Sequence, residues 1–291
     1  MAKNSSDIAD EYEEKVILDM KKVEYKFYEI LLQKLAEFSE GGTLKADPQK
    51  LAQLEATIRQ ALKDAGYSKA IDNYFEAFPA IVNLNQGYYR DDDISIKPLV
   101  NDSELVKNTY AKIEEDLRKG GVNKAIVTTI AEQMRQGILL NSSYQDAADA
   151  IRNTLIEKQL PTKYVFQATS DAIKMYNGAI QDEVKLRYNA THFYYVVGLK
   201  ETSRPFCVHM KDKYGSRAIA YTELEVDLKE YCPNGQPSQE SITFTTIDGI
   251  TETKKKGSGM MENTFTYNFS QKTGGYQCRH DAIPIPGRVQ V

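Results

Sequence analysis

The composition of the chain changes at His192-Phe193-Tyr194-Tyr195-Val196-Val197-Gly198-Leu199, where aromatic and β-branched residues replace a helical pattern. These residue types are enriched in strands, so the segment predicts the first substantial β-strand of the chain. Further on, Ser241 to Thr246 and Ile250 to Lys254 alternate polar and apolar residues around Asp248-Gly249. That arrangement predicts a β-hairpin. Two more expectations for this region are a loop at Lys254 to Gly259 and a strand at Thr264 to Phe269.

The chain before this strand is dominated by helical periodicity. Apolar residues from Ile8 to Phe38 recur at steps of mostly three and four, as on one face of an amphipathic helix, and Gly41-Gly42 follows as a stop signal. Asp47-Pro48 predicts the start of a second helix. Further along, Pro79 should end or bend a helix, and Gly120-Gly121 should close another. Ser142 or Ser143 should cap a helix over Ala147 to Ile156, and helical patterns continue to about Tyr188. The predicted fold class is therefore α+β, with an N-terminal helical bundle followed by a small, mostly antiparallel β-sheet domain.

The apolar stripe of the first helix has two interpretations. Either it packs inside the chain's own domain, or it docks on a partner protein through an apolar contact with a polar rim. Under the second interpretation, the candidate partner-binding residues are Phe27, Leu31, Leu35 and Phe38.

Composition limits the classes of protein to which the chain can belong. Its 291 residues suit one large domain or two small ones. The 37 basic and 41 acidic residues give a net charge of -4. A DNA-coating protein normally carries a basic excess, so the net charge does not support DNA contact. No apolar run is long enough to span a bilayer, and Met1 to Glu14 lacks the pattern of a signal peptide. No membrane partner is expected.

The residues best suited to bind a metal are cysteines and histidines in the C-terminal region. Cys207-Val208-His209 and Cys278-Arg279-His280 form two Cys-x-His units, and Cys232 lies between them. Thiolate and imidazole are preferred zinc ligands, so Cys207, Cys278 and His280 are candidate ligands of a structural zinc ion. The alternative is that the cysteines pack as small apolar side chains. The sequence contains neither a GxSxG nor an HExxH motif, and we predict no catalytic residues.

The same two units lie in segments that resemble a known family. Ser203-Arg204-Pro205-Phe206-Cys207, followed by Lys213-Tyr214-Gly215, resembles the RPFC…G segment of Mu F-like phage minor head proteins. Gly275-Tyr276-Gln277-Cys278-Arg279-His280, followed by Ile283-Pro284-Ile285, resembles their terminal CRC…P segment, with His280 in place of the second cysteine. The resemblance covers about Val122 to Val291. We therefore divide the chain into a helical N-terminal region, 1–121, and a Mu F-like α+β domain, 122–291.

This resemblance implies a role in phage head morphogenesis. Members of the family are low-copy proteins of tailed-phage heads that are linked to the portal, and some are implicated in DNA packaging or delivery. The implied protein is a structural virion component and not an enzyme, made in the host cytoplasm, with portal and capsid proteins as its partners. Two alternatives stay open, a head–tail adaptor and a zinc-stabilised enzyme that processes nucleic acid.

Overall fold

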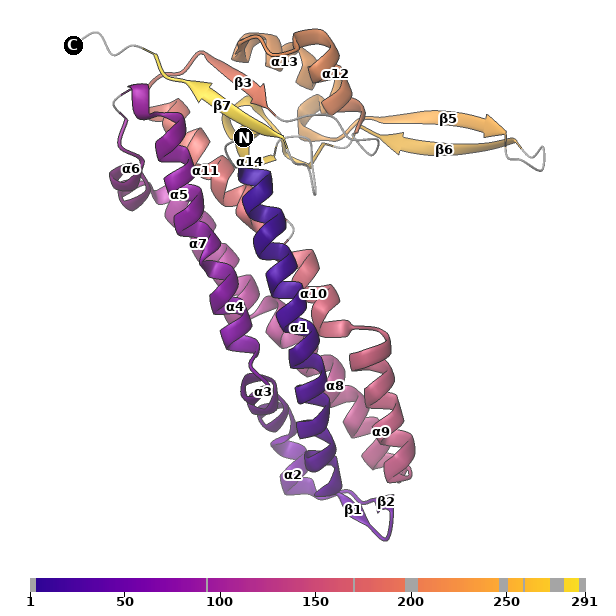
Figure 1. Ribbon diagram of the computed structural model, residues 1–291. Coiled ribbons are helices and arrows are strands. Elements are labelled where there is room, and N and C mark those ends of the chain that lie inside the picture. Colours follow the sequence, from indigo (N-terminus) through magenta and orange to yellow (C-terminus); the bar gives the residue numbers. More distant parts are fainter. Residues whose placement is uncertain are drawn as a thin grey trace. The chain divides into compact units, whose positions relative to one another are not determined.

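The computed structural model describes residues 4–92, 94–169, 171–196, 204–245, 251–258, 260–272 and 280–287 (Figure 1). Helices dominate, and the strands form small antiparallel sheets, so the predicted α+β class is confirmed. The chain divides into two compact units that alternate along the sequence. Unit 1 contains Met1–Ala9, Phe78–Tyr110 and Ser170–Val291, and unit 2 contains Asp10–Ala77 and Ala111–Thr169. The proposed division of the sequence at residues 121 and 122 stays a prediction.

Unit 2 is helical apart from one short hairpin. Its elements are most of α1 (Ser5–Ala36), β1 (Ser39–Glu40), β2 (Thr43–Leu44), α2 (Pro48–Ala52), α3 (Leu54–Asp64), α4 (Tyr67–Phe75), the π-helical turn η2 (Glu115–Lys119), α8 (Gly121–Leu139), α9 (Tyr144–Arg152), the π-helical turn η3 (Asn153–Glu157) and α10 (Leu160–Thr169).

Capping signals correctly located the start of α2 and narrowed the cap of α9 to two serines, Ser142 or Ser143, of which Ser143 is the cap. Asp47 accepts hydrogen bonds from the backbone N–H groups of Gln49 and Lys50, at 2.9 and 3.2 Å, and Pro48 is the first residue of α2. Ser143 accepts one from the N–H of Asp146 at 3.0 Å, at the start of α9. These side chains satisfy backbone donors that the first helical turn leaves free.

The core of unit 2 includes the stripe of α1 that we considered for partner binding. Phe27, Leu31 and Leu35 are completely buried, and Phe38 is 7% exposed. A partner protein cannot reach these side chains unless the unit opens. The four candidates are therefore core residues, and the first interpretation of the stripe, packing within the chain, accounts for them.

Of two helix ends predicted in the first half of the chain, one is wrong and one is confirmed. Pro79 was expected to end or bend a helix, but it lies in the first turn of α5 (Ala77–Tyr88), where a missing N–H costs nothing. Gly120-Gly121 was expected to close a helix, and it does. The helical run of α7 (Glu104–Glu114) and η2 ends at Lys119, Gly120 is its C-cap, and α8 begins at Gly121.

Unit 1 combines helices with the β-structure. Besides α5 and α7 it contains η1 (Arg90–Asp92), α6 (Ile96–Asp102), α11 (Ala172–Arg187), β3 (His192–Val196), α12 (Pro205–Tyr214), β4 (Ile219–Ala220), α13 (Tyr221–Tyr231), η4 (Pro233–Gly235), β5 (Gln239–Thr245), β6 (Thr251–Gly257), η5 (Thr266–Asn268), α14 (Phe269–Lys272) and β7 (Asp281–Ile285).

The main sheet of unit 1 has the order β4-β3-β7 and is antiparallel throughout. Its central strand, β3, is the one predicted from composition. Exposure alternates along β3, and the inward residues Phe193 and Tyr195 join a core with α12, α13 and α14. The inward face of the sheet therefore supplies an apolar surface on which α12 and α13 pack.

In the second sheet of unit 1, the strands of the predicted hairpin pair as β5 with β6, and the predicted turn at Asp248-Gly249 lies outside the described residues. The loop expected at Lys254 to Gly259 is wrong, because pairing with β5 extends β6 through Gly257. The strand expected at Thr264 to Phe269 is also wrong. There the side chain of Asn268 accepts the N–H of Phe265 at 2.8 Å and donates to the carbonyl of Asn263, which favours a 3-10 turn over a strand.

Among the helices of the described residues, none combines the length and the apolarity needed to cross a membrane.

Candidate functional site

The first segment of the family resemblance forms the start of α12. Pro205 occupies the first helical turn, where its fixed φ suits the helix. Phe206 and Cys207 point into the core and are at most 2% exposed. At the other end, Gly215 caps α12 with φ 60° and ψ −121°. Side chains with a Cβ avoid that conformation. The segment therefore sets both ends of α12 and anchors it in the core.

Tyr195 of β3 connects this segment to the second one. Its hydroxyl donates to Cys207 Sγ at 3.5 Å. Its ring stacks on the imidazole of His280, with centroids 5.0 Å apart and planes 9° from parallel. His280 immediately precedes β7, which pairs with β3 along its length. The two segments of the resemblance, distant in sequence, thus meet at one side chain of the central strand.

The cysteines do not define a metal site among the described residues. Cys207 and Cys232 are both buried. The Cys232 thiol donates to the carbonyl of Met261 at 3.6 Å, and burial raises its pKa, which favours the thiol over the thiolate that binds metal. Cys278 lies outside the described residues, and in the described part of the chain no group of three suitable ligands comes together. Zinc at Cys207, Cys278 and His280 stays a prediction.

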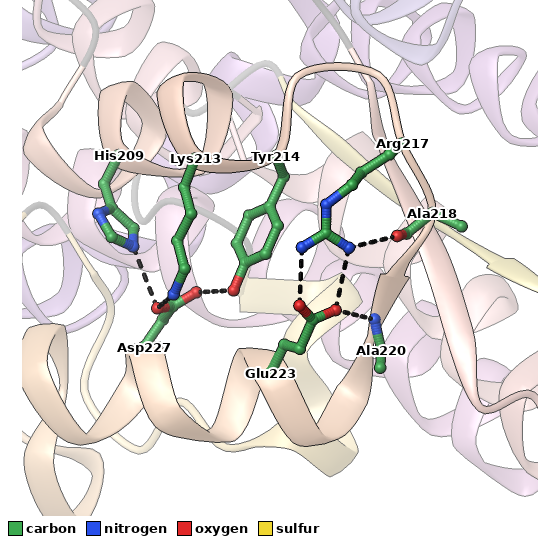
Figure 2. Close-up of polar contacts among 8 residues, drawn as sticks. All are labelled: His209, Lys213, Tyr214, Arg217, Ala218, Ala220, Glu223 and Asp227. Carbon is green, nitrogen blue, oxygen red and sulfur yellow. Dashed lines mark hydrogen bonds and ion pairs between the residues drawn. The ribbon is translucent and has the colours of Figure 1, made fainter.

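The most concentrated polar site in this region joins α12 to α13 (Figure 2). We call it the Asp227 cluster: Asp227 of α13 with His209, Lys213 and Tyr214 of α12. Asp227 Oδ1 accepts from Lys213 Nζ at 2.5 Å, and Oδ2 accepts from the Tyr214 hydroxyl at 2.6 Å. His209 Nε2 lies 3.1 Å from Oδ1, a contact that is an ion pair only when the imidazole is protonated.

The contacts within the cluster favour the charged forms of Asp227 and Lys213. Only 2% of the Asp227 side chain is exposed. Burial by itself raises the carboxyl pKa, but the contacts from Lys213, Tyr214 and His209 outweigh it and leave the Asp227 pKa below its usual value. The hydrogen bond to Asp227 likewise raises the pKa of Lys213. Asp227 is therefore ionised at neutral pH, and its charge is compensated where it lies.

A second, exposed pair lies beside the cluster (Figure 2). Arg217, in the segment between α12 and β4, donates to both oxygens of Glu223 in α13 at 3.1 and 2.7 Å. Glu223 also accepts the backbone N–H of Ala220 at 3.0 Å, just before α13 begins. The hydrogen bond from Arg217, with that of Ala220, lowers the pKa of Glu223 to about 2. This pair attaches the segment that follows α12 to the first turn of α13.

The Asp227 cluster holds α12 against α13. Its contacts suit this structural role better than general acid–base catalysis. A general base must be able to reach a substrate proton, whereas the buried oxygens of Asp227 are already occupied by partners of its own chain. A hollow of about 310 Å³ is lined by other residues of α13 and by Thr264 to Tyr267, and none of the cluster's residues lines it.

The role of Asp227 was not predicted from the sequence, and Lys213 and Tyr214 were named only as part of the resemblance. One signal was available. Glu223 and Asp227 are four residues apart on α13, and His209 and Lys213 are four apart on α12. Residues four apart lie on the same face of a helix. An acidic face on α13 and a basic face on α12 therefore predict that these two helices pack against each other.

No family model, no curated protein and no solved structure matches this chain. Support for a function therefore comes from the residues themselves and from the two segments that resemble the minor head proteins.

Proposed function

We propose that this chain is a minor head protein of a tailed bacteriophage. In this proposal it is a structural component of the virion that binds the portal or the inner capsid and assists head assembly, DNA packaging or DNA delivery. The observation that supports it most is the meeting of the two resembling segments at Tyr195, which contacts Cys207 on one side and His280 on the other. Segments that belong to one family domain are expected to come together in its fold.

The roles of the resembling residues also support a structural protein. Phe206 and Cys207 fill the core, Lys213 and Tyr214 bind the buried Asp227, and Gly215 ends the helix. Each of these residues has a packing or capping task that explains its identity without a substrate.

Under this proposal, contact with the portal or capsid has to use exposed residues in place of the buried stripe of α1. In unit 2, the large apolar side chains that are more than half exposed are Leu18, Tyr25, Leu139 and Leu140. Leu139 and Leu140 are adjacent at the end of α8, at 58% and 77% exposure. The turn that follows them is held to β2 by a hydrogen bond from the N–H of Leu44 to the carbonyl of Ser142 at 3.0 Å. A rigid apolar turn loses little entropy when it docks.

The test is co-purification with the portal protein of the phage that encodes the chain. Tagged wild-type protein should retain the portal protein, and the double substitution Leu139→Asp, Leu140→Asp should lose it while its circular dichroism stays unchanged. The matched control is Leu186→Asp in α11, since Leu186 is equally exposed at 59% but belongs to unit 1. Failure of the wild-type protein to bind portal or capsid protein would contradict the proposal.

A further inference from the structure

The hollow of about 310 Å³ beside α13 belongs entirely to unit 1 and is separate from the Asp227 cluster. It is lined by one face of α13, by Asn234 and Gly235 of η4, and by Thr264 to Tyr267. We call this space the α13 hollow. Ligand pockets have volumes of about 300 to 1,000 Å³. The α13 hollow is therefore large enough for a small ligand only.

The buried lining residues of the α13 hollow form an apolar floor. Leu228, Cys232 and Thr264 are 6%, 2% and 1% exposed. The Cys232 thiol and the Thr264 hydroxyl both donate to the carbonyl of Met261, at 3.6 and 2.6 Å. A polar ligand group placed at this depth would lose its hydrogen bonds to water and find these two donors already in use, which is costly. The floor therefore favours an apolar group.

One wall of the α13 hollow is aromatic. The rings of Phe265 and Tyr267 are stacked, with centroids 5.4 Å apart and planes 10° from parallel. Tyr267 is 63% exposed, so much of its ring is available to a ligand. Aromatic rings attract one another through faces and edges beyond the effect of the area that they bury. An aromatic group in the hollow gains this attraction, whereas an aliphatic group of the same size does not.

This wall is held in place by its own chain. The carbonyl of Thr266 accepts from Lys185 Nζ at 2.5 Å, and the N–H of Asn263 donates to the carbonyl of Gly235 at 2.6 Å. Gly235 has φ 76°, and a Cβ there would lie 2.7 Å from Phe265 Cζ. Glycine at this position therefore lets the Phe265 ring pack on the backbone. A wall that is already formed loses little entropy when a ligand binds.

The mouth of the α13 hollow is charged. Lys229 Nζ lies 3.5 Å from Glu225 Oε1, and the two side chains are 73% and 60% exposed. Asn234 is exposed in the same lining. The core of a protein interface is depleted of charged residues, so this mouth is poorly suited to an aromatic side chain of a protein partner. It suits the polar substituent of a small molecule, which can stay in contact with water.

We propose that the α13 hollow binds a small aromatic molecule that carries one polar substituent. The ring contacts the apolar floor and the wall made by Phe265 and Tyr267, and the substituent lies at the mouth beside Glu225 and Lys229. This inference uses only the lining residues and does not depend on the proposed function.

The experiment is saturation-transfer NMR of the full chain with two probes, phenol and cyclohexanol. The probes have the same number of non-hydrogen atoms and one hydroxyl each, and only phenol is aromatic. Phenol should give a saturable signal. Cyclohexanol should bind more weakly by about three- to tenfold, the factor that corresponds to the loss of one pair of aromatic rings.

Two variants locate the binding. Tyr267→Leu keeps an apolar side chain but removes the ring, so it should weaken phenol by a similar factor and leave cyclohexanol and the circular dichroism unchanged. The matched control is Tyr194→Leu, because Tyr194 of β3 is 46% exposed and does not line the hollow. It should bind phenol like wild type. Wild-type protein without a saturable phenol signal would overturn the proposal. So would equal affinity for phenol and cyclohexanol, or phenol binding that is unchanged in Tyr267→Leu.

Discussion

Asp227 illustrates how a buried carboxylate can stabilise the contact between two helices. Its ionised form is maintained by Lys213 and Tyr214 of the facing helix. We predict that Asp227→Asn lowers the free energy of unfolding by about 2 kcal/mol, since it removes hydrogen bonds to a charged group. The control Glu223→Gln, in the exposed pair with Arg217, should change it little because solvent screens that pair. Urea denaturation of both variants measures the difference, and equal effects would contradict the structural role given to Asp227.

Asp182 predicts a specific pH dependence of stability. This residue of α11 is buried against α14, where it accepts from the N–H of Ser270 at 3.2 Å and from Gln271 Nε2 at 3.0 Å. Burial raises its pKa from 3.8 to about 6. Between these values the folded protein binds a proton that the unfolded chain has lost. The contribution of Asp182 to stability is therefore present below about pH 4 and falls as the pH rises to 6.

The substitution Asp182→Asn removes this titration. We expect the stability of the variant relative to wild type to increase as the pH is raised from 4 to 6, and then to level off. Thermal unfolding across this range measures the trend. Asp212→Asn, at an exposed position, should show no such trend. If the stability difference between Asp182→Asn and wild type does not vary with pH, burial does not raise the pKa of Asp182.

For single residues, the helix caps could be predicted from the sequence, but contacts with residues distant in the sequence could not. The caps at Asp47 and Ser143 depend on backbone donors two or three residues away, and the sequence identified the first and narrowed the second to Ser142 or Ser143. The contacts of Tyr195 with Cys207 and His280 depend on how β3, α12 and β7 are brought together. No local pattern contains that information.

Among the elements, the crossing of α11 and α14 depends on one glycine. A Cβ at Gly178 would overlap the backbone of Ser270 and Gln271, much closer than van der Waals contact allows, and that backbone has no flexible end to move. We predict that Gly178→Ala lowers the free energy of unfolding by at least about 2 kcal/mol. The control is Gly87→Ala near the end of α5, where no heavy atom lies within 4 Å. It should be neutral or slightly stabilising because alanine has the higher helix propensity. Equal effects of the two changes would argue against the close crossing.

The two faces of α1 predict opposite outcomes for the same type of substitution. Leu31 is completely buried, so Leu31→Asp should unfold unit 2, at a cost of more than about 4 kcal/mol for an unpaired buried charge. Leu18 is 51% exposed on the same helix, and Leu18→Asp should leave the fold intact. Circular dichroism and thermal unfolding distinguish them. A folded Leu31→Asp variant would restore the interpretation of the stripe as a docking surface.

Errors at the scale of elements have physical causes. Pro79 interrupts a helical pattern in the sequence, but proline is accepted in a first helical turn, and only the position of the preceding helix end shows which case applies. Lys254 to Gly257 has a loop-like composition, yet pairing with β5 makes it a strand. Cross-strand partners outweigh intrinsic propensity in such segments.

For the whole molecule, composition and periodicity predicted the fold class but not how the chain divides into units. Unit 2 takes one segment from before residue 78 and another from after residue 110, and the first helix begins in unit 1 and continues in unit 2. A sequence pattern shows where a helix is amphipathic, but not which of several distant segments covers its apolar face. The division therefore depends on tertiary contacts.

The proposed function makes this chain part of a phage particle. It can be measured by quantitative mass spectrometry of particles purified from a phage that carries the gene, with the portal protein as internal standard. We predict that the protein remains with intact heads through density-gradient purification, at a constant low ratio to the portal protein. Its complete absence from purified particles and from assembly intermediates would contradict the proposed function.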